Sequence, residues 1–449
     1  MIIKKKILFI LLFICYSVAW SQLSIIPKPN DIKYNDGVFE YAKGVDVKVI
    51  RGTDVTKQAY SQLLDFLNKN NVNVVKFSTS VISINLLKDG LATIPANAYN
   101  IAITPTSIAL TASTDTGIFY GIQTIKQLFY KDSLKKVPCA DIKDIPILNY
   151  RCFHIDAAHR HFSVSVIKEY LESMALLKLN NFRWQLADEN SYHLQLKNTP
   201  TIVDSTEAYS QDDIKEIIRY AAERFINVIP EINLASYAFG EDTSMATRIK
   251  VLDEIISLFP SKYIHLGKSI LYANEATTYL TTKGKKAIVQ DVNYIQNAVV
   301  QSYKSNNLKP AAEGKQVILS PRNFCSLDYY QDWMDEKKAG YMIFLPMYKA
   351  YTFAPLKKIS DANIKANILG AEACTPTIFI KNADELDYMV FPRLVALAEC
   401  MWTNHDNKKK LYDFERRLKS KANYFFEERP EIEVDMVRIN PAKSKKNKK

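Results

Sequence analysis

The stretch SKYIHLGKSILY, residues 261–272, shows most directly how this chain folds. Its aromatic and β-branched run, 263–266, stops at Gly267, and Lys268 and Ser269 follow. A short apolar run that ends at a glycine is typical of a buried strand opening into a loop. Barrel enzymes place their catalytic residues in such loops, at the carboxyl ends of their strands. We therefore begin from a parallel barrel as the working fold.

Strand and helix patterns alternate on both sides of this stretch. The predicted strands are 151–157, 181–187, 225–232, 263–266, 316–320 and 366–371. Helices are predicted at 163–178 and after Ser210, which has Asp213 three residues on as expected of a helix start. Alternation of this kind implies right-handed crossovers and a parallel sheet, and at this length a (β/α) TIM barrel is the natural closure.

The chain before the barrel divides into two parts. Residues 1–21 place three lysines before a short apolar run and a plausible cleavage site, which predicts a signal peptide and an exported protein, periplasmic or secreted. Residues 22–145 predict a small α/β domain, with a hairpin at 99–112 and an amphipathic helix after it. The barrel domain then spans 146–430.

The net charge of +11 overstates how basic the folded protein is. Three lysines lie in the signal peptide, and the last twelve residues hold Arg438 and five lysines, so the folded body carries only +2. We therefore expect no nucleic-acid partner and interpret residues 431–449 as a solvated basic tail. After the signal peptide we expect no segment that spans a membrane.

Five cysteines remain once the signal peptide is removed. They are far apart and form no CxxC or zinc-type spacing, so buried free thiols are expected, with one disulfide left open. His154, His159 and His161 are close in sequence, but no fourth ligand is evident. We expect neither a metal nor another cofactor.

The ends of the predicted strands resemble those of glycoside hydrolase family 20, the β-N-acetylhexosaminidases. The resemblance rests on seven segments taken in order, and on IIPKP at 25–29 in the first domain. These segments are YRCFHIDAAHRHF (150–162), RWQLADENSYH (183–193), VIPEINLASY (228–237), KYIHLGKSI (262–270), VILSPRNFCSLDYYQ (317–331), LGAEACTPTIF (369–379) and FPRLVALAECMWT (391–403). The resemblance implies a retaining, substrate-assisted removal of terminal N-acetylhexosamine, in which the substrate's own acetamide attacks the anomeric carbon.

The same resemblance implies that the catalytic pair is missing. The family motif after strand 4 is His-aliphatic-Gly-Gly-Asp-Glu, and here it reads HLGKSI, from His265 to Ile270. Ser269 therefore stands where the acetamide-orienting aspartate is expected, and Ile270 where the general acid is expected. Losing a general acid typically costs ~10²–10⁴ in rate.

Other pocket positions depart from the family pattern as well. The mature chain has only three tryptophans, Trp184, Trp333 and Trp402, whereas the family lines its sugar site with several. Further departures from the pattern are Tyr237, Asn233, Ser326, Pro376 and Ile378. Between Ile270 and Val317 the chain is short for the family and only 287–303 reads as a helix, so we expect a barrel that is incomplete or irregular around strands 5 and 6.

Some family positions are kept. Arg151 and Asp328 match residues that hold the terminal sugar, and Asp156, Asp188 and Glu231 occupy family positions at strand ends. These five are the candidate substrate-binding residues, although charged groups at strand ends also form structural ion pairs.

Three hypotheses about function remain open. In the first, the protein is a relative of the hexosaminidases that has lost hydrolysis and binds N-acetylhexosamine-type glycans or a partner. In the second, it is an active glycosidase with a relocated acid, for which Glu189, Glu231 and Asp188 are candidates. In the third, it is a structural or interaction module. The sequence does not decide the oligomeric state.

Overall fold

The computed structural model describes residues 22–88, 94–130, 133–199, 207–305, 307–332, 341–357, 359–408, 410–426 and 429. The signal peptide and the basic tail predicted above lie outside these residues. The chain divides into two compact units. Of the described residues, the first unit comprises 22–25, 31–88 and 99–143, and the second comprises 26–30, 94–98 and those from 144 onward.

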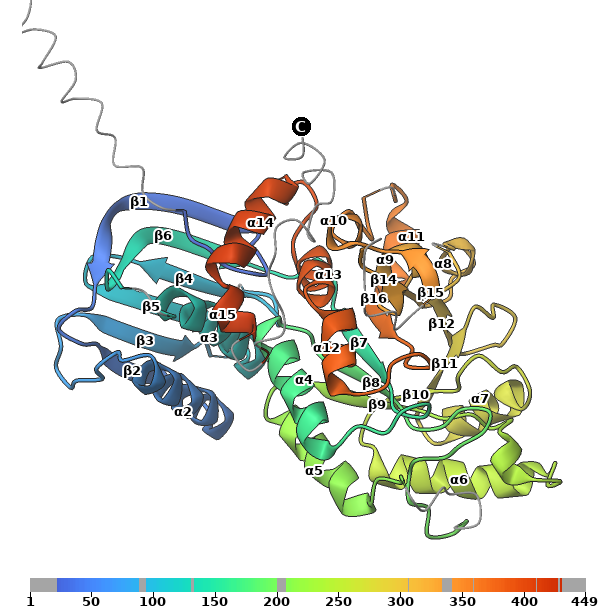
Figure 1. Ribbon diagram of the computed structural model, residues 1–449. Coiled ribbons are helices and arrows are strands. Elements are labelled where there is room, and N and C mark those ends of the chain that lie inside the picture. Colours follow the sequence, from blue (N-terminus) through green and yellow to red (C-terminus); the bar gives the residue numbers. More distant parts are fainter. Residues whose placement is uncertain are drawn as a thin grey trace, which may run out of the picture. The chain divides into compact units, whose positions relative to one another are not determined.

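The first unit is a six-stranded mixed sheet in the order β1-β6-β4-β5-β3-β2. Helices α2 and α3 pack together against one face of it (Figure 1). The predicted hairpin is present, because β4 and β5 pair antiparallel. The elements are β1 (Asp31–Glu40), β2 (Asp46–Arg51), α2 (Asp54–Lys69), β3 (Val81–Leu86), β4 (Tyr99–Ile103), β5 (Ser107–Ala112), α3 (Asp115–Phe129) and β6 (Lys136–Asp144).

The second unit is a closed barrel of eight parallel strands, which confirms the predicted fold class (Figure 1). Its strands, from first to eighth, are β7 (Tyr150–Asp156), β8 (Asn181–Gln185), β9 (Asn227–Glu231), β10 (Tyr263–His265), β11 (Lys286–Gln290), β12 (Val299–Ser302), β13 (Val317–Leu319) and β16 (Ile368–Thr375). Gly370 lets the eighth strand close on the first, since a Cβ there would lie 1.7 Å from the carbonyl oxygen of Tyr150.

Helices cover the barrel unevenly. Four helices of ten or more residues follow the first four strands: α4 (Val164–Leu176), α5 (Gln211–Ala222), α6 (Met245–Leu258) and α7 (Ala273–Thr282). Shorter elements follow: η2 (Tyr237–Phe239), α8 (Lys309–Ala312), α9 (Arg322–Cys325), β14 (Tyr329–Tyr330), β15 (Tyr341–Phe344), α10 (Met347–Ala350) and α11 (Ala362–Ala366). The chain then forms α12 (Ala383–Val390), α13 (Arg393–Trp402), α14 (Leu411–Ser420) and α15 (Ala422–Phe426). The start of α5 has the full capping box, with Ser210 and Asp213 bonded reciprocally.

The prediction of an incomplete barrel was wrong. Residues 287–303, read as a helix, contain most of β11 and all of β12, and both pair in register with their neighbours. Short apolar runs such as KAIVQ and VVQS do not distinguish helix from strand by periodicity. What is reduced here is the helical layer: the described chain has no helix between β11 and β12, and only the four-residue α8 between β12 and β13.

The barrel interior changes from apolar to polar along the strands. Near the strand starts, a fully buried cluster fills the barrel with Tyr150, Cys152, Ile229, Ile288, Val299 and Ile318. Inward-facing side chains of a TIM barrel lie in layers that alternate strands contribute. The next layers, toward the carboxyl ends, hold charged and amide side chains instead, and these layers form the floor of the site.

The five cysteines of the mature chain are free and buried, as expected. Among the described residues, no helix is long and apolar enough to cross a membrane.

Candidate functional site

The floor of the site is a buried hydrogen-bonded ring from the even-numbered barrel strands. Arg183 of β8 donates to the Glu372 carboxylate of β16, with Nη2 to Oε1 at 2.6 Å. Gln301 of β12 donates to the same oxygen at 2.6 Å. His265 of β10 lies 3.0 Å from the Gln301 amide oxygen and completes the ring. A charged group inside a barrel is tolerated only with such partners.

Glu231 of β9 extends this ring toward the mouth of the barrel. One of its oxygens accepts from the Arg183 guanidinium, so Glu231 and Glu372 share a single cation. Burial raises the pKa of Glu231 to about 7, and the nearby negative charge of Glu372 adds to this. Glu231 is therefore the carboxyl group of the site that can hold a proton near neutral pH.

Two imidazoles flank Glu231, and both are neutral. Their pKa values are lowered well below the usual range by burial and by the Arg183 charge. In His265, Nδ1 accepts from the Gly267 amide, so Nε2 carries the proton. In His154, Nδ1 accepts from the Thr375 amide, so Nε2–H faces Gln185 at 3.2 Å and Glu231 at 3.7 Å. Because both ring nitrogens of His265 have hydrogen-bond partners, we interpret His265 as a structural residue.

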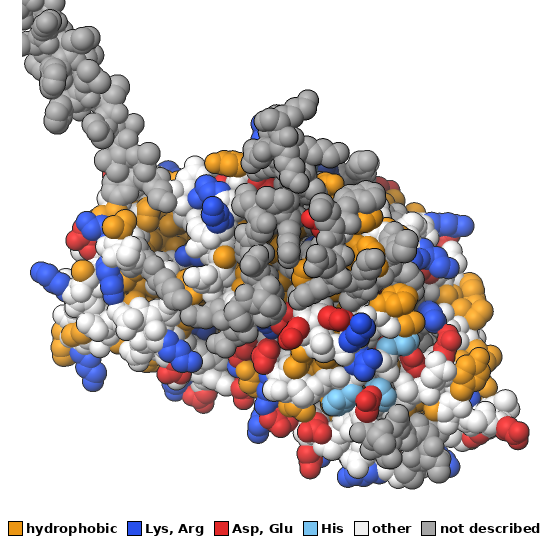
Figure 2. Space-filling view, in the orientation of Figure 1, with side chains coloured by type: hydrophobic (Ala, Val, Ile, Leu, Met, Phe, Trp, Pro, Cys, Tyr) orange, Lys and Arg blue, Asp and Glu red, His pale blue; other side chains and the backbone are white. Residues whose placement is uncertain are grey.

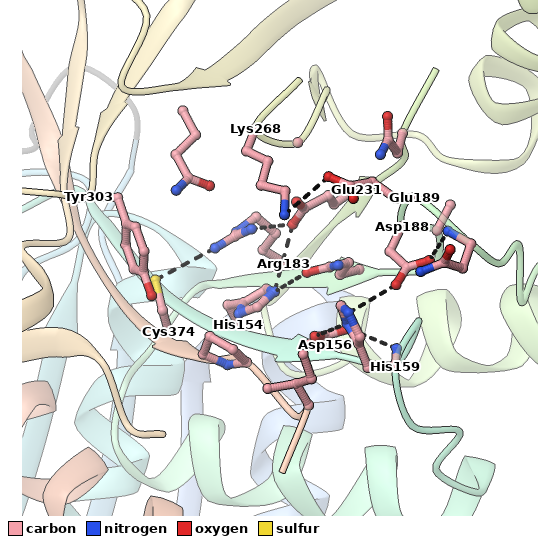
Figure 3. A pocket seen from close by; sticks show the side chains of 18 residues that line it. His154, Asp156, His159, Arg183, Asp188, Glu189, Glu231, Lys268, Tyr303 and Cys374 are labelled. Carbon is pink, nitrogen blue, oxygen red and sulfur yellow. Dashed lines mark hydrogen bonds and ion pairs between the residues drawn. The ribbon is translucent and has the colours of Figure 1, made fainter. Parts of the chain in front are cut away.

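Above this floor a cavity of about 230 Å³ opens at the carboxyl ends of the strands (Figure 3). Three of the five predicted site residues line it: Asp156, Asp188 and Glu231. Pockets for small ligands are usually somewhat larger, about 300–1,000 Å³. The cavity accordingly suits no more than one small polar ligand.

His159 links two of these carboxylates. Its Nδ1 lies 2.7 Å from Asp156 and its Nε2 lies 2.9 Å from Asp188, so both ring nitrogens donate (Figure 3). Hydrogen bonds to the two carboxylates raise the pKa of His159 to about 10, and the pKa of Asp188 is lowered to about 2. His159 is a permanent cation at neutral pH, and about a third of its side chain is exposed. The sequence had raised His159 only as a possible metal ligand.

The loop after β10 contributes no acid. Gly267 adopts a left-handed conformation at φ +70°, which turns the chain outward after the strand. Lys268 then reaches across the cavity mouth to Glu189, with 3.2 Å between nitrogen and oxygen (Figure 3). The Ser269 hydroxyl accepts from the Leu271 amide, and the Ile270 side chain is 58% exposed.

The opposite rim of the cavity is mostly neutral. Tyr303, Cys374, Pro376 and Ile378 line it. Asp328, predicted to hold a sugar, is not among the described residues that line the cavity. It is buried behind the rim and accepts from Ser326 at 2.6 Å, and the Ser326 hydroxyl lies 2.9 Å from that of Tyr303. Asp328 therefore reaches the cavity only through this pair of hydroxyls.

Arg151 is not part of this cavity, and the prediction that it holds a sugar is contradicted. It lies near the start of β7, five residues before Asp156, which corresponds to roughly 16 Å along a strand. Its guanidinium donates to the carbonyl oxygens of Lys178 and Leu148, each at 2.8 Å, and packs on the Trp402 ring. Arg151 is thus a fully buried structural residue at the opposite end of the barrel.

The tryptophans also lie away from the described cavity wall. Trp184 is fully buried beside Phe182 and Tyr209, and Trp402 is fully buried next to Arg151. Trp333 lies outside the described residues. Among the described residues, no group of three or more His, Cys, Asp or Glu side chains has the arrangement of a metal site.

Sequence reasoning missed Arg183 and Glu372, the centre of the buried ring. A signal was present, because Arg183 stands between Phe182 and Trp184 inside a predicted strand and so had to find a buried carboxylate. The partner could not be read from the sequence, since it lies six barrel strands further along the chain.

The comparisons with known proteins agree with this architecture. The model of glycosyl hydrolase family 20, catalytic domain, matches residues 148–240 and 268–405, and the model of domain 2 of that family matches residues 22–145. The stretch 241–267, which contains β10, is not matched.

Individual relatives are distant. The chain is 27% identical to a beta-hexosaminidase of Vibrio furnissii, over 84% of this chain and 76% of the relative. It is 26% identical to a beta-hexosaminidase of Porphyromonas gingivalis, over 69% of this chain but only 51% of the relative. The solved beta-N-acetylhexosaminidase of Bacteroides fragilis has the same fold, with a TM-score of 0.77 at 24% identity over 91% of this chain and 96% of that one. On the family models, this chain is a member of glycosyl hydrolase family 20.

Proposed function

We propose that this protein binds a terminal N-acetylhexosamine-type sugar of a glycan in the cavity at the barrel mouth and does not hydrolyse it. The observation that carries the proposal is the chemistry of the loop after β10. Its positions 268–270 place an ammonium, a hydroxyl and an exposed aliphatic side chain at the mouth, with no carboxyl group. Glycoside hydrolysis needs an acid that protonates the leaving oxygen.

Three of the four carboxyl groups that line the described cavity, all except Glu231, are poorly suited to replace that acid. Asp156 and Asp188 both accept from the His159 cation, and Glu189 is paired with Lys268. The lowered pKa of Asp188, about 2, keeps it ionised at neutral pH. An ionised carboxylate has no proton to donate.

The same groups can bind sugar hydroxyls. His159 is a donor at the mouth, and Asp188 and Glu189 are acceptors, all lining one cavity. Hydrogen bonds to charged groups contribute about 1.5–3 kcal/mol each. The described wall lacks the large aromatic surface that would add to this, and association entropy opposes binding. Binding on the order of millimolar, about −4 kcal/mol, is the expected result.

Two measurements on one preparation test the proposal. Ligand-observed NMR with N-acetylglucosamine, up to about ten times the expected millimolar Kd, should show binding, and His159→Gln should abolish it. The control is Lys283→Ala. Lys283 is an exposed lysine that directly follows α7 and pairs with Asp253 at 3.2 Å. An aryl N-acetylglucosaminide should not be turned over. If the parent protein does not bind the sugar, the remaining hypothesis is that it is a structural or interaction module.

Glu231 keeps a second candidate function open, hydrolysis with a relocated acid. It lines the cavity, and its pKa of about 7 gives it a proton to donate near neutral pH. Of the three candidates named from the sequence, it is therefore the one that the electrostatics favour over Asp188 and Glu189. Turnover of the aryl substrate that disappears in Glu231→Gln would establish this function and refute the binding-only proposal.

We also propose that the protein is exported, on the basis of residues 1–21. Expression of the whole chain in a Gram-negative host, followed by mass measurement of the periplasmic fraction, should give a product that begins near residue 22. A product that retains Met1 in the cytoplasm would contradict export.

A further inference from the structure

A second cavity lies at the opposite end of the barrel from the proposed sugar site. Its volume is about 390 Å³. It is lined by Ile147, which precedes β7, by residues 353–357 between α10 and α11, and by residues that end or follow α13. Helices of a barrel run back to the starts of the strands, so these segments meet at the amino ends. Nothing in the proposed function uses this end of the barrel.

Basic side chains dominate the polar part of this cavity. Lys357, Lys365 and Lys408 line it, against one acidic side chain, Asp406. The Lys408 ammonium is fixed in the wall, since it donates to the Tyr351 carbonyl oxygen at 2.6 Å. Lys357 and Lys365 are exposed, so their charges can reach an anion without unfolding any part of the barrel.

His405 stands in the wall of this cavity beside the lysines. Its Nε2 accepts from the Lys357 ammonium at 2.8 Å, so the proton of the neutral ring must be on Nδ1. That Nδ1 is buried and has no hydrogen-bond partner among the described residues. Burial and the charges of Lys408 and Lys357 lower the pKa of His405 and hold it neutral. The Lys357 ammonium and the His405 ring thus lie next to each other in the cavity wall, so an anion bound by Lys357 would also lie close to the imidazole.

The rest of the wall is apolar. Ile147, Phe353, Pro355 and Leu356 line the cavity alongside the lysines. An inorganic anion alone would leave this surface in contact with water, whereas a ligand with a short hydrocarbon part would cover it.

We propose that this second cavity binds a small amphiphilic anion, such as an alkyl sulfate or carboxylate, whose oxygens accept from the ammonium groups of Lys357 and Lys365. Its hydrocarbon part would lie against Phe353 and Ile147. The negative charge would face these two exposed cations and the fixed Lys408, with Asp406 as the one opposing acid of the described lining.

His405 itself reports whether this binding occurs. The chain has only six histidines, so with ¹³C-labelled histidine each ring signal can be followed against pH, and His405→Asn assigns the signal of interest. An anion within about 4–6 Å raises the pKa of an imidazole by one pH unit or more. Saturating hexyl sulfate should therefore raise the pKa of His405 by at least about one pH unit. Inorganic sulfate should do the same but with at least about tenfold weaker binding, because it leaves the apolar wall uncovered.

Three controls make the test decisive. Sodium chloride at matched ionic strength measures the effect of screening alone. The double variant Lys357→Met/Lys365→Met should lose the response, whereas Lys283→Met/Lys309→Met, two exposed lysines paired elsewhere, should keep it. The proposal is overturned if hexyl sulfate acts only like chloride, if the first double variant responds like the parent, or if the ligand moves the His159 signal instead. Because His159 reports on the sugar cavity, failure here is distinguishable from failure of the proposed function.

Discussion

The two halves of the cavity at the barrel mouth have opposite chemistry. The half built by β7, β8 and β9 supplies all the carboxylates of the described lining: Asp156, Asp188, Glu189 and Glu231. The half built by β10 to β16 supplies one lysine and otherwise neutral side chains: Lys268, Gln290, Tyr303, Cys374, Pro376 and Ile378. The general acid of the family is expected in the second half.

A difference in burial accompanies this difference in chemistry. The kept carboxylate Glu231 is tied into the buried ring by its bond to Arg183, so its loss would remove a charge-assisted hydrogen bond inside the barrel. Lys268 and Ile270 lie on an exposed loop where substitution costs the fold little. The kept charges therefore reflect the needs of the barrel, at least in part, and are weak evidence for catalysis.

The face of the molecule seen in Figure 2 mixes acidic and basic side chains, without one large region of a single sign.

Removing the shared cation should have the largest effect. Arg183→Met leaves Glu231 and Glu372 buried without their shared cation, and breaking such a buried pair costs about 3–5 kcal/mol. Urea unfolding measures this directly. Arg416→Met, which removes an arginine paired with Asp413 near the surface of α14, should cost no more than about 1 kcal/mol. Equal losses in the two variants would show that the buried ring does not support the barrel.

The protonation of Glu231 should be visible in the pH dependence of stability. Its folded pKa, about 7, is above its ordinary value of 4.5, so its contribution to stability is complete below pH 4.5 and is lost as the pH rises through 7. Glu231→Gln does not titrate. Between pH 4.5 and pH 8 the variant should therefore gain on the parent, by up to about 3 kcal/mol. A constant difference across this range would mean that Arg183 keeps Glu231 ionised, and the relocated-acid hypothesis would lose its support.

The two hydrogen bonds from His159 to Asp156 and Asp188, called here the His159 bridge, should stabilise the fold over a different pH range. The folded pKa of His159, about 10, is above its ordinary value of 6.5, so its stabilisation is complete below pH 6.5 and disappears as the pH rises through 10. The pKa of Asp188, lowered to about 2 from 3.8, adds stability that is present above pH 3.8 and is lost as the pH falls through 2. His159→Gln should therefore cost most between pH 4 and 6.5, about 1–2 kcal/mol after screening by solvent.

The control for the His159 bridge is a substitution of His161, two residues further along the chain. His161 packs on Tyr209, and burial lowers its pKa, so His161→Gln should not reproduce that window. If both variants lose stability equally at every pH, the bridge contributes through packing and not through charge.

The sequence predicted the fold well because the barrel strands and their helices have clear apolar patterns. It failed at β11 and β12, where runs of five and four residues are too short to show a period. For the site, Asp156, Asp188 and Glu231 do line the cavity, because Asp156 and Glu231 end strands and Asp188 follows the end of β8 by three residues, whereas their binding of a sugar stays a prediction. Arg151 was misplaced because its residue type was considered without its position near the start of β7, far from the carboxyl end of the strand where the cavity opens.

The smallest effect concerns Lys268, the cation of the otherwise neutral half. From the sequence alone, a lysine at this position would favour acidic or sulfated sugars. In the structure, however, Lys268 already pairs with Glu189, and both side chains are about half exposed or more. Exposed pairs contribute only about 0–1 kcal/mol, so Lys268→Ala should hardly change the free energy of unfolding.

The same variant leaves Glu189 unpaired and makes the mouth of the cavity more negative. Binding of a sulfated N-acetylhexosamine should therefore weaken by no more than about fivefold, which corresponds to roughly 1 kcal/mol, while binding of the neutral sugar should stay within twofold. Parallel titrations by ligand-observed NMR, with Lys283→Ala as the matched control, measure both. A loss of neutral-sugar binding in Lys268→Ala would show that the ammonium contacts the sugar itself, and the neutral half of the cavity would then take part in recognition.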